Sequence, residues 1–114
     1  MENKNIITLK KINERAGEAM LDTKDLTYEE FIKDDKTVRA TVFSISQIGE
    51  LVKDLDDEFT NKYNNIMWSK IKGLRNRIVH DYDGIQLNIV WQIIKNNLPE
   101  LTKDIDNIIK NERS

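Results

Sequence analysis

The amino-acid sequence predicts an all-α protein, an up-and-down bundle of four to five helices. Apolar residues recur at helical spacing along nearly the whole chain. Only one Pro and four Gly occur among 114 residues, so few positions favour turns. The segments between the expected helices are short, which favours antiparallel neighbours. Because the chain has no linker or repeat and an ordinary domain length, we expect a single domain over residues 1–114.

The first half of the chain is expected to form three helices. The first, at about residues 5–21, has an apolar face made by Leu9, Ile12, Ala16 and Met20. Thr27-Tyr28-Glu29-Glu30 is a capping box, which predicts the start of a short helix. A long helix is expected at about residues 35–55. Its core face would be Val38, Val42, Ile45, Ile48, Val52 and Leu55.

The second half continues the helical pattern. Residues 57–65 are rich in Asn and Asp, which predicts an irregular or short-helical connection. The next helix is expected at about residues 66–79, and Asp83-Gly84 is a predicted turn. The core face of the helix at residues 66–79 would be Met67, Ile71, Leu74 and Ile78.

The last segment keeps one apolar face from residue 87 to residue 108. This face is made by Leu87, Trp91, Ile94, Leu98, Leu101, Ile105 and Ile108. Pro99 interrupts the segment. Because proline lacks a backbone donor and clashes one turn back, we expect a kinked or restarted last helix there.

Charge and composition exclude several kinds of protein. The net charge of −2 argues against a protein that coats nucleic acid through bulk charge. Residues 70–80 are basic and residues 50–58 acidic, which fits either a local anion site or two solvated helix faces. Without cysteine, disulfides and thiolate metal sites are excluded. No signal-peptide pattern or apolar run of about 18 residues occurs, so a cytoplasmic protein without a membrane segment is expected.

Residues 73–82 carry the main candidate for chemistry. They contain the only histidine of the chain, His80, with Arg75 and Asn76 before it and Tyr82 after it. On a helix, Gly73, Asn76 and His80 would lie roughly opposite the core face. Asn76 and His80 would be neighbours four residues apart, so the amide could orient the imidazole. Since Gly73 allows another backbone to approach closely, this face suits a cleft shared with a second protomer.

These residue types fit RNA cleavage without a metal. A histidine can take the proton of the RNA 2′-hydroxyl or protonate the leaving oxygen. An arginine can bind the non-bridging phosphate oxygens as charge builds in the transition state. The chain has no histidine–cysteine cluster and no Gly-rich phosphate loop, so neither zinc hydrolysis nor P-loop chemistry fits, and no cofactor is expected. The alternative is structural, because His80 and Arg77 could also cap a helix C-terminus.

The spacing Arg75-x4-His80-x-Tyr82, with Asn76 after the arginine, resembles the motif of the HEPN superfamily and of its HepT-like toxin branch. The similarity extends over most of the chain. It includes residues 36–40, 48–50, 68, 73–76, 82–85, 90–94 and 97–101.

This resemblance implies an all-α bundle that forms a homodimer with the two motifs facing one groove. It implies a toxin of a toxin–antitoxin system, a metal-independent endoribonuclease with Arg75 and His80 as catalytic residues and Asn76 in support. It also implies a cognate MntA-like nucleotidyltransferase antitoxin that transfers AMP to Tyr82. A non-catalytic HEPN dimer, which binds a nucleotide or scaffolds a nucleotidyltransferase, remains the alternative, and a purely structural helical dimer is the third reading.

Overall fold

The structure of the protein, a computed structural model, describes residues 3–73 and 87–113. All regular secondary structure in these residues is helical, which confirms the predicted fold class. Residues 68–73 are also helical. The named elements are α1 (Lys4–Asp22), α2 (Tyr28–Lys33), α3 (Asp35–Val52), α4 (Asp57–Lys62), α6 (Leu87–Gln92), the π-helical segment η2 (Ile93–Asn97) and α7 (Leu98–Arg113).

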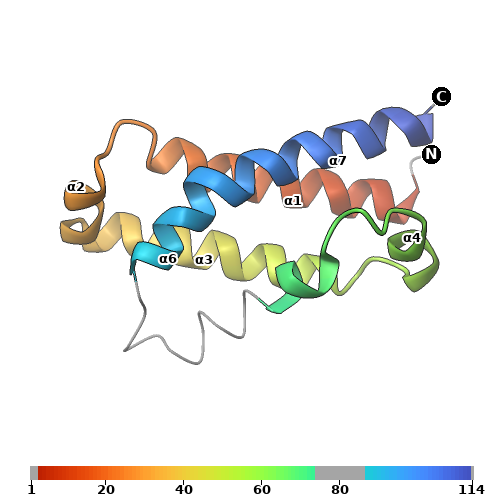
Figure 1. Ribbon diagram of the computed structural model, residues 1–114, viewed down its shortest axis with the longest axis horizontal. Coiled ribbons are helices and arrows are strands. Elements are labelled where there is room, and N and C mark those ends of the chain that lie inside the picture. The colour runs from red at the N-terminus through yellow and green to blue at the C-terminus, as the bar shows by residue number, and fades with distance from the viewer. Residues whose placement is uncertain (1–2, 74–86, 114) are drawn as a thin grey trace.

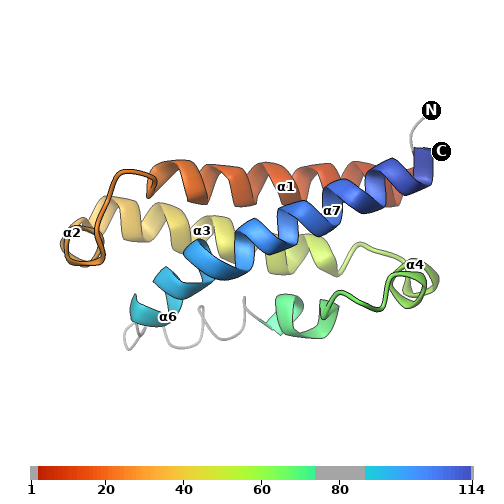
Figure 2. The same ribbon diagram turned by 45° about the horizontal axis from the view of Figure 1, so that its top comes forward.

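The three long helices α1, α3 and α7 run side by side and form the body of the molecule (Figure 1). α3 and α7 run antiparallel to α1, and the two ends of the chain lie at the same end of the bundle (Figures 1 and 2). The core between them is aliphatic. Its fully buried members include Leu9, Ile12, Ile45, Ile48 and Ile105. The predicted apolar faces of the first and third helices therefore do face the core, with Met20 and Val38 only partly buried.

Polar side chains cap the N-termini of α1, α2 and α3. The predicted capping box is confirmed, because Thr27 accepts a hydrogen bond from the Glu30 amide and the Glu30 side chain accepts one from the Thr27 amide. Asp34 caps α3 with a single hydrogen bond, which its side chain accepts from the Thr37 amide. This bond lowers the pKa of the Asp34 carboxyl. Asn3 caps α1 by accepting from the Asn5 amide at 2.7 Å.

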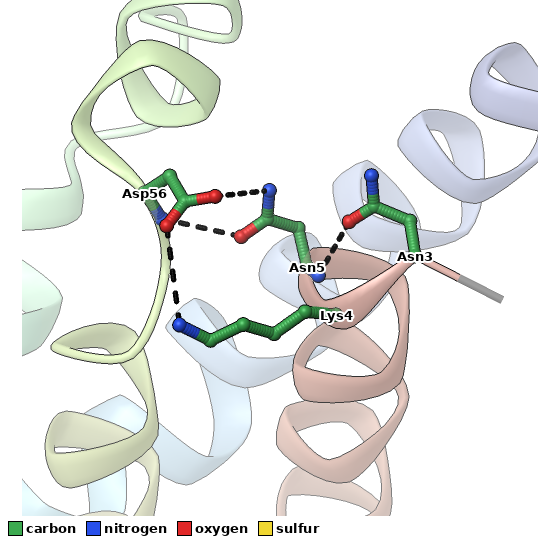
Figure 3. Close-up of polar contacts among 4 residues, drawn as sticks. All are labelled: Asn3, Lys4, Asn5 and Asp56. Atoms are coloured by element: carbon green, nitrogen blue, oxygen red, sulfur yellow. Dashed lines mark hydrogen bonds and ion pairs between the residues drawn. The ribbon is translucent and has the colours of Figure 1, made fainter.

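The start of α4 is held differently, by a contact with the start of α1 (Figure 3). Asp56 precedes α4, but its carboxylate makes no capping bond. Instead it accepts a hydrogen bond from the buried Asn5 amide group at 3.2 Å, while the Asp56 backbone donates to the Asn5 side-chain oxygen at 3.2 Å. Lys4 lies 4.0 Å from the same carboxylate. These bonds join residues 51 positions apart and fix the connection after α3 to the bundle.

Two predicted boundaries differ from the structure. α3 ends at Val52, three residues earlier than expected, and the next three backbone amides donate to the carbonyls three residues before them. This tight turn still buries Leu55. The prediction that Met67 faces the core is wrong, since its side chain is 58% exposed. The helix begins only at Trp68, and the buried side chains there are Ile66 and Trp68.

The predicted break near Pro99 takes the form of a π-helical segment one turn earlier. In η2, the Leu98 amide donates to the Ile93 carbonyl, five residues back. Pro99 has no amide to bond the Lys95 carbonyl, and its ring would clash with that carbonyl in a regular helix. The wider turn relieves the clash. The apolar face continues through it, with Ile94 buried inside the wide turn and Leu98 and Leu101 buried after it.

Candidate active site and the groove beside it

The residues predicted to form the active site lie outside the described residues. They are Arg75, Asn76, His80 and Tyr82. Their assignments therefore stay predictions. The described chain stops at Gly73 and resumes at Leu87, the first residue of α6.

A groove of about 570 Å³ lies beside Gly73 and the segment η2. Its described lining comes from two stretches of the chain, residues 70–73 and residues 89–97. The lining residues are Lys70, Ile71, Gly73, Ile89, Gln92, Ile93 and Asn97. One of these lining residues, Gly73, precedes the predicted Arg75 by two positions in the sequence. The volume of the groove falls in the range of ligand-binding clefts, roughly 300–1,000 Å³.

The groove has an apolar floor and a polar rim. Ile93 is buried, and Ile71 and Ile89 are half-buried, so together they make the inner lining aliphatic. Gln92 and Asn97 stand exposed at the rim. Within residues 3–73 and 87–113, no hydrogen bond or ion pair engages either side-chain amide. Both amides therefore have no side-chain partner within the described part of the chain.

The π-helical segment brings these two amides to the same groove. In a regular α-helix, residues five positions apart point about 140° away from each other, at 100° per residue. In η2 the hydrogen bonds join residues five apart, so such residues lie nearly above one another. Gln92 and Asn97 are five apart and both line the groove. The arrangement depends on the wide turn that Pro99 favours.

Charge is distributed unevenly along the groove. A smaller hollow of about 260 Å³ shares Lys70, Ile71 and Asn97 with it and continues along α7 past Glu100 and Asp104. The far end is therefore acidic. Lys70 lines both hollows, and in the sequence the basic stretch continues into Arg75 and Arg77. The carboxylates of Glu100 and Asp104 would repel an anionic group from the part along α7.

Gly73 has open space around it. A Cβ atom built on Gly73 would meet no atom within 4 Å. The same holds for Gly17 in α1. That a second backbone approaches Gly73 stays a prediction. The open space means that neither glycine is required by packing within the described chain.

A polar cluster at the far end of the bundle is structural in character. The Glu112 carboxylate accepts hydrogen bonds from the Lys62 ammonium at 2.8 Å and from the Tyr63 hydroxyl. Asn111 donates to that same hydroxyl at 2.8 Å. The bond from Lys62, with that from Tyr63, lowers the pKa of Glu112, and the bond to Glu112 raises the pKa of Lys62. These contacts join α4 to the end of α7.

Another cluster joins α2 to the last helical segment. The Trp91 ring lies 5.1 Å from that of Phe31 and 6.0 Å from that of Tyr28, and the Lys95 ammonium lies 4.6 Å above it. Lys95 also donates to the Thr23 carbonyl at 3.0 Å. These contacts hold η2 against the bundle body. The side of the groove that η2 lines is therefore fixed to the bundle.

Neither a metal site nor a membrane span is found among the described residues. No group of three or more His, Asp or Glu side chains there could hold a metal ion. None of the helices in this part of the chain combines the length and the apolar character needed to cross a membrane.

The chain belongs to the HepT-like ribonuclease family. A family model described as "Ribonuclease HepT-like" matches residues 7–108, which include the whole predicted site. The resemblance drawn from the sequence is thereby confirmed, and so is the expected class of enzyme, an endoribonuclease, at the level of the family.

Curated relatives agree with this family. "Putative RNase MJ0127" of Methanocaldococcus jannaschii is 43% identical over 88 residues, 77% of this chain and 73% of the relative. "Putative RNase TTE0752" of Caldanaerobacter subterraneus is 38% identical over 90 residues, 79% and 80% of the two chains. "Probable ribonuclease HepT" of Thermococcus cleftensis is 26% identical over 88 residues, 77% and 80% of the two chains. No solved structure matches the chain.

The groove was not predicted from the sequence. Gln92 and Asn97 lie in stretches that resemble the family, and on a regular helix residues five positions apart would lie on different faces. The one available signal was Pro99, which predicted a break but not its form. In the sequence, Lys70 stands out only as part of the basic stretch at residues 70–80.

Proposed function

We propose that this chain is the toxin of a toxin–antitoxin system and cleaves RNA without a metal, using Arg75 and His80 in a groove between two copies. The family match carries this proposal, because it spans residues 75–82. Arg75, His80 and Tyr82 occupy the positions of the family motif. We further propose that a cognate MntA-like nucleotidyltransferase neutralises the toxin by transferring AMP to Tyr82.

The chemistry follows from the RNA itself. His80 removes the proton of the 2′-hydroxyl, whose oxygen attacks the adjacent phosphorus while the bond to the 5′-oxygen breaks. The products are a 2′,3′-cyclic phosphate and a free 5′-hydroxyl, which takes up a proton. Arg75 binds the non-bridging oxygens as their negative charge increases. Asn76 holds the imidazole in position.

The dimer is supported by the open side of the molecule. Gly73 leaves room for a second backbone, and Met67, on the same short stretch, is 58% exposed. A domain of 114 residues is also small for enclosing an RNA strand alone. Two copies meeting near Gly73 would place two Arg75/His80 pairs in one groove.

Tyr82 is proposed as the modified residue partly because of what the other tyrosines do. The Tyr63 hydroxyl is already bonded to Glu112 and Asn111. Tyr28 is half-buried beside Trp91. In the transfer, the Tyr82 oxygen would attack the α-phosphorus of ATP and release pyrophosphate. The added phosphate would compete for Arg75 and block the RNA backbone.

The direct test is growth of cells that express this chain with and without its genomic neighbour. We expect growth arrest by the chain alone and rescue by the active neighbour. Cells that express Arg75→Ala or His80→Ala should grow normally. Arg15→Ala is the control and should stay toxic, because Arg15 forms an ion pair with Glu18 on α1. A chain that never slows growth and cleaves no RNA would favour the non-catalytic HEPN dimer.

The modification is tested with purified proteins. The chain is incubated with its neighbouring nucleotidyltransferase, ATP and Mg²⁺, and the added AMP is mapped by mass spectrometry. We expect AMP on Tyr82, and we expect Tyr82→Phe to stay toxic yet escape neutralisation. Tyr28→Phe is the control and should be neutralised like the wild type. AMP on another residue, or a silenced Tyr82→Phe, would refute this part of the proposal.

A further inference from the structure

We infer that the groove lined by Lys70, Gln92, Ile93 and Asn97 binds one base of the RNA substrate and selects the nucleotide beside the cleaved phosphate. This inference rests on the proposed ribonuclease activity and adds a specificity site to it. The residues involved all lie within the described chain, outside the catalytic motif.

The shape and polarity of the groove fit a nucleobase. Ile71, Ile89 and Ile93 form an aliphatic floor that can contact the face of a flat ring. The amides of Gln92 and Asn97 each offer a donor and an acceptor, the combination that recognises the edge of a base. Proteins read RNA sequence mainly from unpaired bases turned out of the stack, which need a pocket of this kind.

The charges set the direction in which the nucleotide lies. Glu100 and Asp104 outnumber Lys70 in the continuation of the groove along α7, which disfavours a phosphate backbone there. Lys70 lies on the rim of the groove, and Arg75 follows Gly73 by two positions. The phosphate of a base in the groove would therefore lie toward Gly73, away from Glu100 and Asp104. Because only two positions of the chain separate Gly73 from Arg75, we assign the selected nucleotide to the position next to the cleavage point.

The π-helical segment gives the site its specificity. Gln92 and Asn97 share the groove only because η2 places residues five apart on the same side. Lys95, in the same segment, is anchored to Trp91 and to the Thr23 carbonyl, so the wide turn is held against the bundle body. The two amides are thus presented from a fixed element, which favours discrimination between bases.

The test compares cleavage-site preferences. Wild type, Gln92→Ala, Asn97→Ala and Asn96→Ala each digest a pool of RNA with randomised sequence, and the fragment ends are sequenced. Asn96 is the matched control, since it is exposed in the same segment and does not line the groove. We expect the preference at one position beside the cut to fall by about fivefold or more in Gln92→Ala and Asn97→Ala, and to persist in Asn96→Ala.

A second measurement separates this inference from the proposed activity. Binding of His80→Ala protein to short oligonucleotides that differ in one base is measured with and without the Asn97→Ala change. We expect base discrimination that the second change removes, whether or not the wild type cleaves RNA. Mononucleotides alone are the third arm. Tighter binding of a mononucleotide than of an oligonucleotide would overturn RNA as the source of the base. Unchanged preferences in both groove variants, or an equal loss in Asn96→Ala, would overturn the base site itself.

Discussion

The two sides of the bundle are built on different principles. On one side, α1, α3 and α7 enclose an aliphatic core, and side-chain caps begin α1 and α3. On the other side, residues 66–73 and the π-helical segment surround an open groove with unengaged amides at its rim. Stability is concentrated on the first side and ligand-binding capacity on the second. Substitutions on the two sides should therefore affect different measurements.

The largest expected effect is on catalysis. Arg75→Ala and His80→Ala should each lower the rate of RNA cleavage by about a hundredfold or more, because a phosphate clamp or a general base is lost. Their melting temperatures should stay near the wild-type value, since neither residue is predicted to face the core. Cleavage is measured with a labelled oligoribonucleotide and melting by circular dichroism. Full activity in either variant would contradict the assignment of that residue.

The reverse behaviour is expected in the bundle body. Ile45 is fully buried in α3, so Ile45→Ala should reduce the free energy of unfolding by about 2–5 kcal/mol. Phe43, two positions away, is 57% exposed. Phe43→Ala should therefore change the free energy of unfolding by no more than about 0.5 kcal/mol. Urea denaturation of the two variants compares the core and the surface of one helix, and a similar loss in both would refute the assigned packing.

A pair of glycines separates folding from association. Gly17 and Gly73 are both helical, and a Cβ at either would meet no atom within 4 Å. Gly17→Ala should stabilise the fold by about 0.5–1 kcal/mol, because alanine is the better helix former. Gly73→Ala should give a similar gain within the protomer but weaken the dimer. Sedimentation at several concentrations measures the difference, and an unchanged dimer in Gly73→Ala would remove Gly73 from the interface.

The smallest expected effect is the pH response of the contact between α4 and α7. The pKa of Glu112 is lowered in the folded protein, so its contribution to stability is present above its ordinary pKa and is lost as the pH falls. The pKa of Lys62 is raised, so its contribution is present below its ordinary pKa and is lost at high pH. Glu112→Gln should flatten the acid side of the melting-temperature profile. An unchanged profile would mean that this exposed contact adds nothing measurable.

The sequence predicted the body of the molecule better than its open side. Periodic positions such as Leu9, Ile45 and Ile105 identified the core because a regular helix turns by a constant angle per residue. That constancy fails where the backbone changes pitch. Met67 was assigned to the core, but its helix begins at Trp68, and the turn before it buries Ile66.

The catalytic motif could be proposed from the sequence, whereas the groove could not. Arg75 and His80 could be proposed from residue type and spacing, because the chemistry needs those side chains close together. Gln92 and Asn97 could not, since only the wide turn before Pro99 brings them together. A sequence pattern based on a constant helical angle cannot show a site that depends on a local change of pitch.

Cleavage of one RNA in the presence of excess EDTA tests the central claim most directly. The substrate is an oligoribonucleotide with a mapped cleavage site, compared with the same strand carrying a single 2′-deoxy sugar on the 5′ side of that site. We expect full cleavage of the first in EDTA, with a 2′,3′-cyclic phosphate product, and no cleavage of the second at that site. Loss of cleavage in EDTA, or cutting at the 2′-deoxy position, would contradict the metal-free mechanism assigned to Arg75 and His80.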